Sequence, residues 1–203
     1  MHLRVTPMIS FSKRRSREQS MIHTALDYIR REVVAYLGVT NNEVILGHIH
    51  TLKDEPESGL TISLVNLEEE SALKNTSHQI RQNGTARYQQ PPVHLVLYLL
   101  FVANFDDYAA SLLRLSQTIE LFQQKPAFTA ANQLAANPFP ATLEKLIFDF
   151  YTLNLEQLNH LWGVLGGAYF PSVLYRVRLV RVQRDESTAA PEITTIQVET
   201  TVR

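Results

Sequence analysis

Two histidines are the residues of this chain that could hold a metal ion. His48 and His50 lie two positions apart in the segment 43–50, whose partly β-branched composition predicts a short strand. Residues two apart on a strand point to the same face, so both imidazoles could reach one ion. Two ligands fall short of the usual protein site, and the chain has no cysteine to complete it. We therefore expect two surface or half-buried histidines, with no metal ion and no other cofactor.

A pair of carboxylates for acid–base catalysis would be offered by Asp106 and Asp107. Adjacent residues on a helix do not face each other, however. Both lie where a helix is predicted to begin, a position that favours negative charge and gives Asp106 the place of the N-cap. The chain contains no phosphate-loop, dinucleotide-binding, zinc-protease or serine-hydrolase motif. We expect no enzymatic activity; a small hydrolase without a recognised motif is an alternative that an activity screen would test.

Arginines concentrate in the segment 174–184. Arg176 and Arg178 alternate with apolar residues, and Arg181 follows a slip of one position that predicts a β-bulge near residues 179–180. A basic strand with an interleaved aromatic residue can bind single-stranded nucleic acid, so a nucleic-acid-binding module is the alternative function. The formal net charge is only −1 and the aromatic signature of RNA-binding sheets is missing. Pairing of these arginines with carboxylates at a protein interface is therefore the favoured interpretation.

Two further stretches suit contact with a partner. Glu68, Glu69 and Glu70 form an acidic patch that faces either solvent or a basic partner surface. Residues 193–202 alternate between apolar and polar, with one face formed by Ile196, Val198 and Val202. Such a terminal strand can add to the sheet edge of a neighbour or pair within its own domain, and the pattern leaves both alternatives open.

The composition is that of one globular domain with appendages, since 45% of the 203 residues are hydrophobic and 19% are charged. The balanced charge gives no general attraction to nucleic acid or to anionic membranes. The longest apolar run, 95–103, is too short to cross a bilayer as a helix. The basic residues 1–20 are followed by no apolar segment of a secretory signal, so we expect a protein that is assembled in the cytoplasm.

The hydrophobic periodicity predicts about three amphipathic helices. The first begins at Met21 and ends before Gly38, and a capping box at Asn154–Gln157 opens the last. The second follows Asp106 and ends before Pro126, with a predicted buried stripe of Tyr108, Leu112, Leu115, Ile119 and Phe122.

Strands are predicted over 43–50, 60–67, 93–103, 143–153 and 172–184, although the pattern of 143–153 fits a helix nearly as well. A long polar loop is predicted over 68–92, and irregular structure with room for one short strand over 127–142. This order predicts an α+β fold, in which a mixed, mainly antiparallel sheet is packed by the helices. We divide the chain into a basic N-terminal extension (1–20), an α+β domain (21–184) and a C-terminal linker with a β-strand arm (185–203).

Several stretches together resemble the cap, or tube-terminator, proteins of extracellular contractile injection systems, the phage-tail-like particles of the antifeeding prophage and Photorhabdus virulence cassette type. The resemblance covers about residues 21–184 and rests on Ile22–Ile29, Leu60–Glu70, Pro91–Leu95, Leu97–Phe101, Ala103–Tyr108, Leu155–Trp162 and Leu174–Arg178. It does not extend to residues 1–20 or to the loop 71–90. Val96 also departs from the pattern, because family members more often carry a polar residue there.

The resemblance implies a fold related to phage tail terminators and a non-enzymatic role. Family members form a ring of six copies on the distal end of the inner tube, stop its growth and tie the last sheath ring to it. The implied partners are therefore other copies of the chain, the tube protein and the sheath protein, with no nucleic acid and no membrane. The particle would be released or membrane-anchored after its assembly.

Overall fold

The computed structural model describes residues 21–50, 52, 58–70, 79–82, 85–89, 94–181 and 187–189. The helices are α1 (Met21–Leu37), α3 (Tyr108–Gln124) and α4 (Leu155–Val164). The strands are β1 (Val44–Leu46), β2 (Gly59–Glu69), β3 (Gln79–Gln82), β4 (Thr85–Gln89), β5 (His94–Asn104), β6 (Ala127–Phe128), β7 (Leu143–Tyr151), β8 (Ser172–Arg181) and β9 (Ser187–Ala189). In the described part of the chain, short 3-10 helices cover Asn41–Glu43 and Ala130–Asn132.

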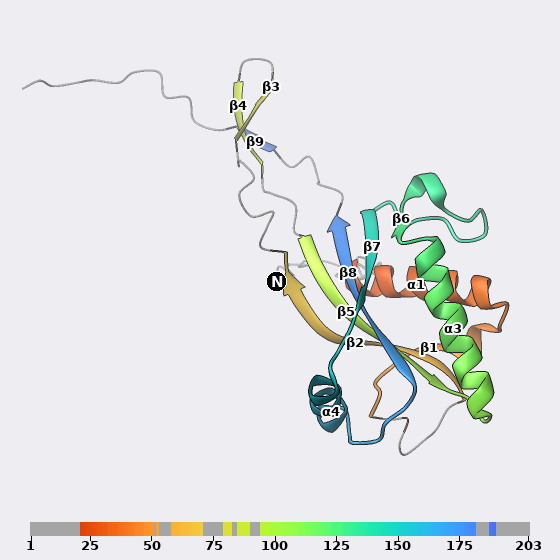
Figure 1. Ribbon diagram of the computed structural model, residues 1–203. Helices are drawn as coiled ribbons and strands as arrows, with labels where there is room; N and C mark the ends of the chain where they lie inside the picture. The colour runs from red at the N-terminus through yellow and green to blue at the C-terminus, as the bar shows by residue number, and fades with distance from the viewer. Residues whose placement is uncertain are drawn as a thin grey trace, which may run out of the picture.

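A six-stranded sheet in the order β1-β2-β5-β8-β7-β6 forms the centre of the fold (Figure 1). Its strands pair antiparallel except for β1 and β2, which are parallel. Helices α1 and α3 contribute to a core on one face of the sheet, and α4 contributes to a second core on the other face. The predicted α+β fold with a mixed, mainly antiparallel sheet and three helices is confirmed.

Strand β5 lies in the middle of the sheet and is buried on both faces. Leu97, Leu99 and Phe101 point into the core with α1 and α3, whereas Leu100 and Val102 point into the core with α4. A strand between two hydrophobic layers needs apolar residues at consecutive positions, which is why the predicted strand 93–103 reads as an unbroken apolar run.

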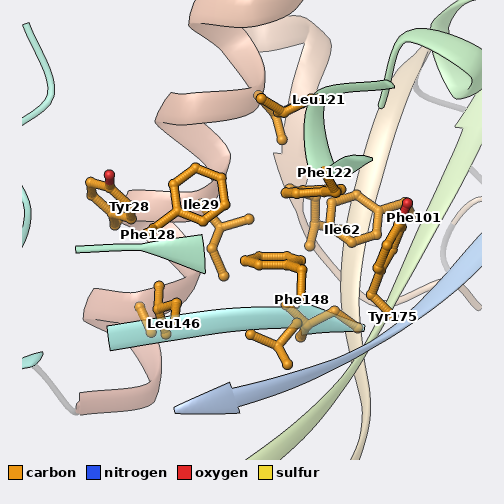
Figure 2. Close-up of a cluster of buried hydrophobic side chains, with 14 of the residues drawn as sticks. Tyr28, Ile29, Ile62, Phe101, Leu121, Phe122, Phe128, Leu146, Phe148 and Tyr175 are labelled. Carbon is orange, nitrogen blue, oxygen red and sulfur yellow. The ribbon is translucent and has the colours of Figure 1, made fainter. Parts of the chain in front are cut away.

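Aromatic rings fill the core between the sheet and helices α1 and α3 (Figure 2). The rings of Phe122 from α3 and Phe148 from β7 stack with centroids 4.1 Å apart and planes 8° apart. Tyr175 of β8 meets Phe101 edge-on at 5.7 Å. Each such pair adds about 0.5–1.5 kcal/mol beyond the burial of its area, so this cluster fixes the helices on the sheet.

A buried carboxylate connects three segments that are distant in the sequence. Glu32 of α1 is 2% exposed, and its two oxygens accept from Lys125 Nζ at 2.9 Å and Asn137 Nδ2 at 2.8 Å. The Asn137 amide also donates to the backbone carbonyl of Tyr28 at 3.3 Å. Burial and the neighbouring Glu32 carboxylate raise the pKa of Tyr28. The end of α3 and the loop before β7 are thus fixed against α1, and we call Glu32, Lys125 and Asn137 the buried polar cluster.

The start of α3 differs from the prediction by one residue. Asp107, not Asp106, is the N-cap, and its carboxylate accepts from the backbone N–H groups of Ala109 and Ala110. The predicted stripe is also wrong at its N-terminal end, because Tyr108 and Leu112 are exposed. The buried positions of this helix are Ser111, Thr118, Leu121 and Phe122. Ser111 and Thr118 can be buried here because their hydroxyls donate to the backbone carbonyls of Asp107 and Arg114.

Three other predictions are corrected. The strand 43–50 ends at Leu46, so His48 and His50 lie outside it and the same-face argument for a metal site no longer holds. The predicted loop 68–92 contains the ends of β2 and the strands β3 and β4, which form a three-stranded sheet with β9 from the predicted linker. The bulge predicted in β8 near residues 179–180 is found in the neighbouring strand instead. The register of β7 shifts between Leu143 and Lys145, which pair with Arg181 and Val180 of β8.

The C-terminus of α1 and the N-terminus of α4 agree with the sequence prediction. Gly38 ends α1 with a φ of 64°, in the left-handed region that favours glycine. The capping box of Asn154 and Gln157 opens α4. Residues 182–186 and 190–203 lie outside the described residues, and with them the predicted strand 193–202.

Candidate protein-interaction face of the sheet

Strand register places the arginines of β8 in the middle of a sheet face that α4 covers only in part. Arg176 lies between Tyr98 of β5 and Asp149 of β7, and the next row places Arg178 beside Ile147. Helix α4 packs over the other end of this face, where Leu100, Val102 and Leu174 form the second core with Trp162. We call the remaining part the outer-sheet face; it consists of Glu68, Glu70, His94, Tyr98, Lys145, Ile147, Asp149, Tyr151, Arg176, Arg178 and Val180.

Both guanidinium groups of the outer-sheet face are held by carboxylates of the same chain. Arg176 Nη2 lies 3.2 Å from an oxygen of Glu70, and Arg178 Nη2 lies 3.1 Å from an oxygen of Asp149. Both pairs are partly exposed, so each contributes about 0–1 kcal/mol to stability at most. Their main effect is to hold two long side chains in one position. Less side-chain conformational entropy is then lost when a partner binds.

Two tyrosines extend the face toward α4. The Tyr98 hydroxyl donates to Glu68 at 3.0 Å, and burial together with this carboxylate raises the pKa of Tyr98. The Tyr98 and Tyr151 rings meet edge-on, with centroids 5.3 Å apart. Tyrosine and arginine are the residue types that most often dominate the binding energy of protein interfaces. The outer-sheet face brings two of each together in fixed positions.

A hollow of about 300 Å³ lies beside the arginines, at the end of the face that is distant from α4. Its lining combines the Glu70–Arg176 pair and Arg178 with apolar side chains, notably Ile147 and Val180. A site of this size and composition can accept one apolar side chain from a partner while the rim provides polar contacts.

The predicted contact residues fall into three groups. Glu70 and Arg176 come together, although they are 106 positions apart in the sequence, and Glu68 and Arg178 lie on the same face. Glu69 is exposed at the end of β2. Arg181 is the last residue of β8, paired with Leu143, and its side chain is not described. Ile196, Val198 and Val202 lie outside the described residues.

Sequence reasoning missed Tyr98, Asp149 and Tyr151 as members of the face. The signal that could have found two of them was parity: Asp149 and Tyr151 share a parity along β7, opposite to the parity of the buried Leu146 and Phe148. Which carboxylate meets which arginine depends on register between strands far apart in the sequence, and the pattern of a single strand does not determine that register.

The charges of the outer-sheet face do not form a basic patch. Its cationic groups, from Arg176, Arg178 and Lys145, are matched in number by the carboxylates of Glu68, Glu70 and Asp149. Binding of nucleic acid requires an excess of positive charge along the backbone path, so this arrangement does not favour it.

No group of three or more candidate ligands that could hold a metal ion occurs among the described residues. In the same part of the chain, no helix combines the length and the apolar character that crossing a membrane would need.

The chain matches a family model and is similar in fold to solved structures. The sequence model of the family described as the Pvc16 N-terminal domain matches residues 22–196. The fold is similar to the sheath/tube terminator of an extracellular contractile injection system, PVC, in its extended state, with 16% identity and a TM-score of 0.56 over 92% of this chain. It is also similar to the tube-terminating cap of the anti-feeding prophage, with 15% identity and a TM-score of 0.57 over 90% of this chain.

The chain spans 65% of the length of the first of these structures and 62% of the second. No curated protein sequence matches it. At 15–16% identity the two structures establish the fold that this chain shares with them, and the family match establishes descent over most of its length.

Proposed function

Because this chain belongs to the Pvc16 N-terminal domain family, we propose that it is a structural cap that ends the inner tube of a contractile injection system and couples the tube to the last sheath ring. The observation that carries this proposal is the similarity of its whole described fold to two proteins described as a sheath/tube terminator and as a tube-terminating cap. We further propose that it works without catalysis, as one copy in a hexameric ring.

The outer-sheet face is the surface that we assign to the tube or sheath protein. A cap has to recognise the last ring of a tube by shape and by many modest contacts, and it does not need a reaction centre. Preordered tyrosine and arginine side chains beside an apolar hollow suit that task, because a face with fixed side chains loses little entropy on docking. The intrachain pairs Arg176–Glu70 and Arg178–Asp149 supply this order.

The particle would be assembled in the cytoplasm and then act outside the cell, as the extracellular system of the similar terminator does. The nucleic-acid-binding alternative has no observation in its favour, because the arginines that suggested it are accompanied by carboxylates on the same face.

Electron microscopy of particles from cells with and without the gene for this chain tests the proposal. We expect inner tubes of scattered length, or sheaths that do not stay extended, when the gene is absent. The wild-type gene supplied in trans should restore uniform particles. Particles that keep their length, shape and sheath state without the gene would rule out the role as a terminator.

A further inference from the structure

Two apolar surfaces remain uncovered by any other described element, and they lie on opposite sides of the sheet (Figure 1). One is formed by α4 and the loop that follows it, where Leu155 and Val164 are 85% and 87% exposed. The other is the first half of α3, where Tyr108 is 67% exposed and Leu112 and Leu113 are exposed beside it. We call them the α4 groove and the α3 ridge. Large hydrophobic side chains gathered in this way mark a surface for binding another protein.

The α4 groove is a hollow of about 290 Å³ lined by Leu155, Leu158, Asn159, Trp162, Gly163, Gly167 and Tyr169. Trp162 is buried and meets Tyr169 edge-on at 5.6 Å, which gives the groove a rigid aromatic wall. A Cβ atom added at Gly163 or at Gly167 would meet no atom within 4 Å. The two glycines therefore leave open space that the fold itself does not fill, and another backbone can approach closely there.

The α3 ridge has the complementary form. Tyr108, Leu112 and Leu113 project from a regular helix, and the exposed Ala109 between them is small enough to permit close approach. Small residues on both sides of a contact allow two helices to pack at short distance, with the large side chains inserted into the spaces that remain.

Both surfaces are poor in charged residues. Residues 108–113 contain no Asp, Glu, Lys or Arg, and Glu156 is the one such residue in the segment 155–169 that lines the groove. Solvent-facing helices usually carry more charged residues, and their depletion is the compositional mark of the buried centre of an interface. Glu156 is not among the lining residues, so contact between the ridge and the lining of the groove buries no unpaired charge and causes no large desolvation penalty.

We propose that the α4 groove of one copy of this chain receives the α3 ridge of a second copy. The contact is head-to-tail, because it joins two different surfaces and leaves a free ridge on one copy and a free groove on the other. Contacts of this kind repeat, and they form a closed ring when the rotation between copies closes. The inference rests on the proposed function in so far as the hexameric ring is the assembly that this contact would build.

Cysteine cross-linking tests the contact directly, because the chain has no cysteine of its own. One variant carries Leu113→Cys on the ridge and the other carries Asn159→Cys in the lining of the groove, which keeps the open space at Gly163 and Gly167. Both positions are exposed, so both variants should fold. A short bismaleimide linker added to the mixture, in solution and on assembled particles, should give covalent dimers at least tenfold above the yield of either variant alone. A chain with both cysteines should give a ladder of higher oligomers.

The matched control replaces Leu113→Cys by Glu120→Cys, which is exposed on the same helix but outside the ridge. This control should give no more dimer with Asn159→Cys than each variant gives alone. Capped tubes of uniform length without a cross-link between positions 113 and 159 would overturn the contact and leave the proposed function intact. Cross-linked ladders together with particles that do not change when the gene is absent would support the contact and overturn the proposed function.

Discussion

Two ion pairs of similar length lie in opposite environments in this protein. Lys125 and Glu32 are 2.9 Å apart in the buried polar cluster, where the Glu32 side chain is 2% exposed. Arg176 and Glu70 are 3.2 Å apart on the outer-sheet face, where their side chains are 35% and 18% exposed. The Coulomb attraction between unit charges at such distances is several-fold stronger in the protein interior than near water.

The same type of ion pair therefore has two different roles in this protein. In the buried polar cluster, a carboxylate without its partners would be an uncompensated buried charge, so the pair makes the positions of α1, the end of α3 and residue Asn137 depend on one another. On the outer-sheet face, water can replace a lost partner, so the pair adds little to stability. What it supplies there is a defined side-chain position for recognition.

The largest effect is expected from Glu32→Ala. This change leaves Lys125 and the Asn137 amide without their buried acceptor and opens a cavity, and we expect the free energy of unfolding to fall by about 3–5 kcal/mol. Urea unfolding followed by circular dichroism measures it. The control is Glu120→Ala on the exposed side of α3, which should change stability by less than about 0.5 kcal/mol. Equal effects of the two changes would refute the coupling that we assign to the buried polar cluster.

A smaller effect is expected from a buried hydroxyl. Burial raises the pKa of Tyr175 to about 12. The folded state therefore keeps this proton at a pH where the unfolded chain, with a pKa of about 10, has lost it. The ionisation of Tyr175 therefore does not lower the free energy of unfolding below about pH 10. Between about pH 10 and pH 12 it lowers this free energy by about 1.4 kcal/mol per pH unit.

Unfolding of the wild type and of Tyr175→Phe at pH 8 and at pH 11 measures this dependence. The Tyr175 hydroxyl has no hydrogen-bond partner among the described residues, so its loss should leave stability at pH 8 nearly unchanged. The variant should lose about 1 kcal/mol less than the wild type at pH 11. Identical losses would mean that Tyr175 is already accessible to water in the folded protein.

The sequence predicted the scaffold far better than the site. The apolar run around Leu97–Phe101 and the capping box at Asn154 depend on neighbours within one element, and both are confirmed. The pairs Glu70–Arg176 and Asp149–Arg178 depend on which strands are neighbours and in which register, a property of the whole sheet. The exposed Tyr108 and Leu112 misled the prediction for a related reason. Hydrophobic periodicity identifies an apolar helix face, but it does not distinguish a face that packs on the chain's own sheet from one left for a partner.

The smallest effect on stability is expected from Arg178→Gln on the outer-sheet face. The Arg178–Asp149 pair is 3.1 Å long and both side chains are more than 40% exposed. Its loss should lower the free energy of unfolding by no more than about 0.5–1 kcal/mol. Under the proposed function the same change removes a contact to the tube or sheath protein, so co-purification of the folded variant with particles should fall several-fold. Arg31→Gln on α1, on the opposite side of the sheet, is the matched control, because it removes a similarly exposed guanidinium group that is paired with Asp27, and it should bind as the wild type does. Normal binding by Arg178→Gln would remove the outer-sheet face from the proposed interface, and a large loss of stability would mean that this exposed pair behaves like the buried one.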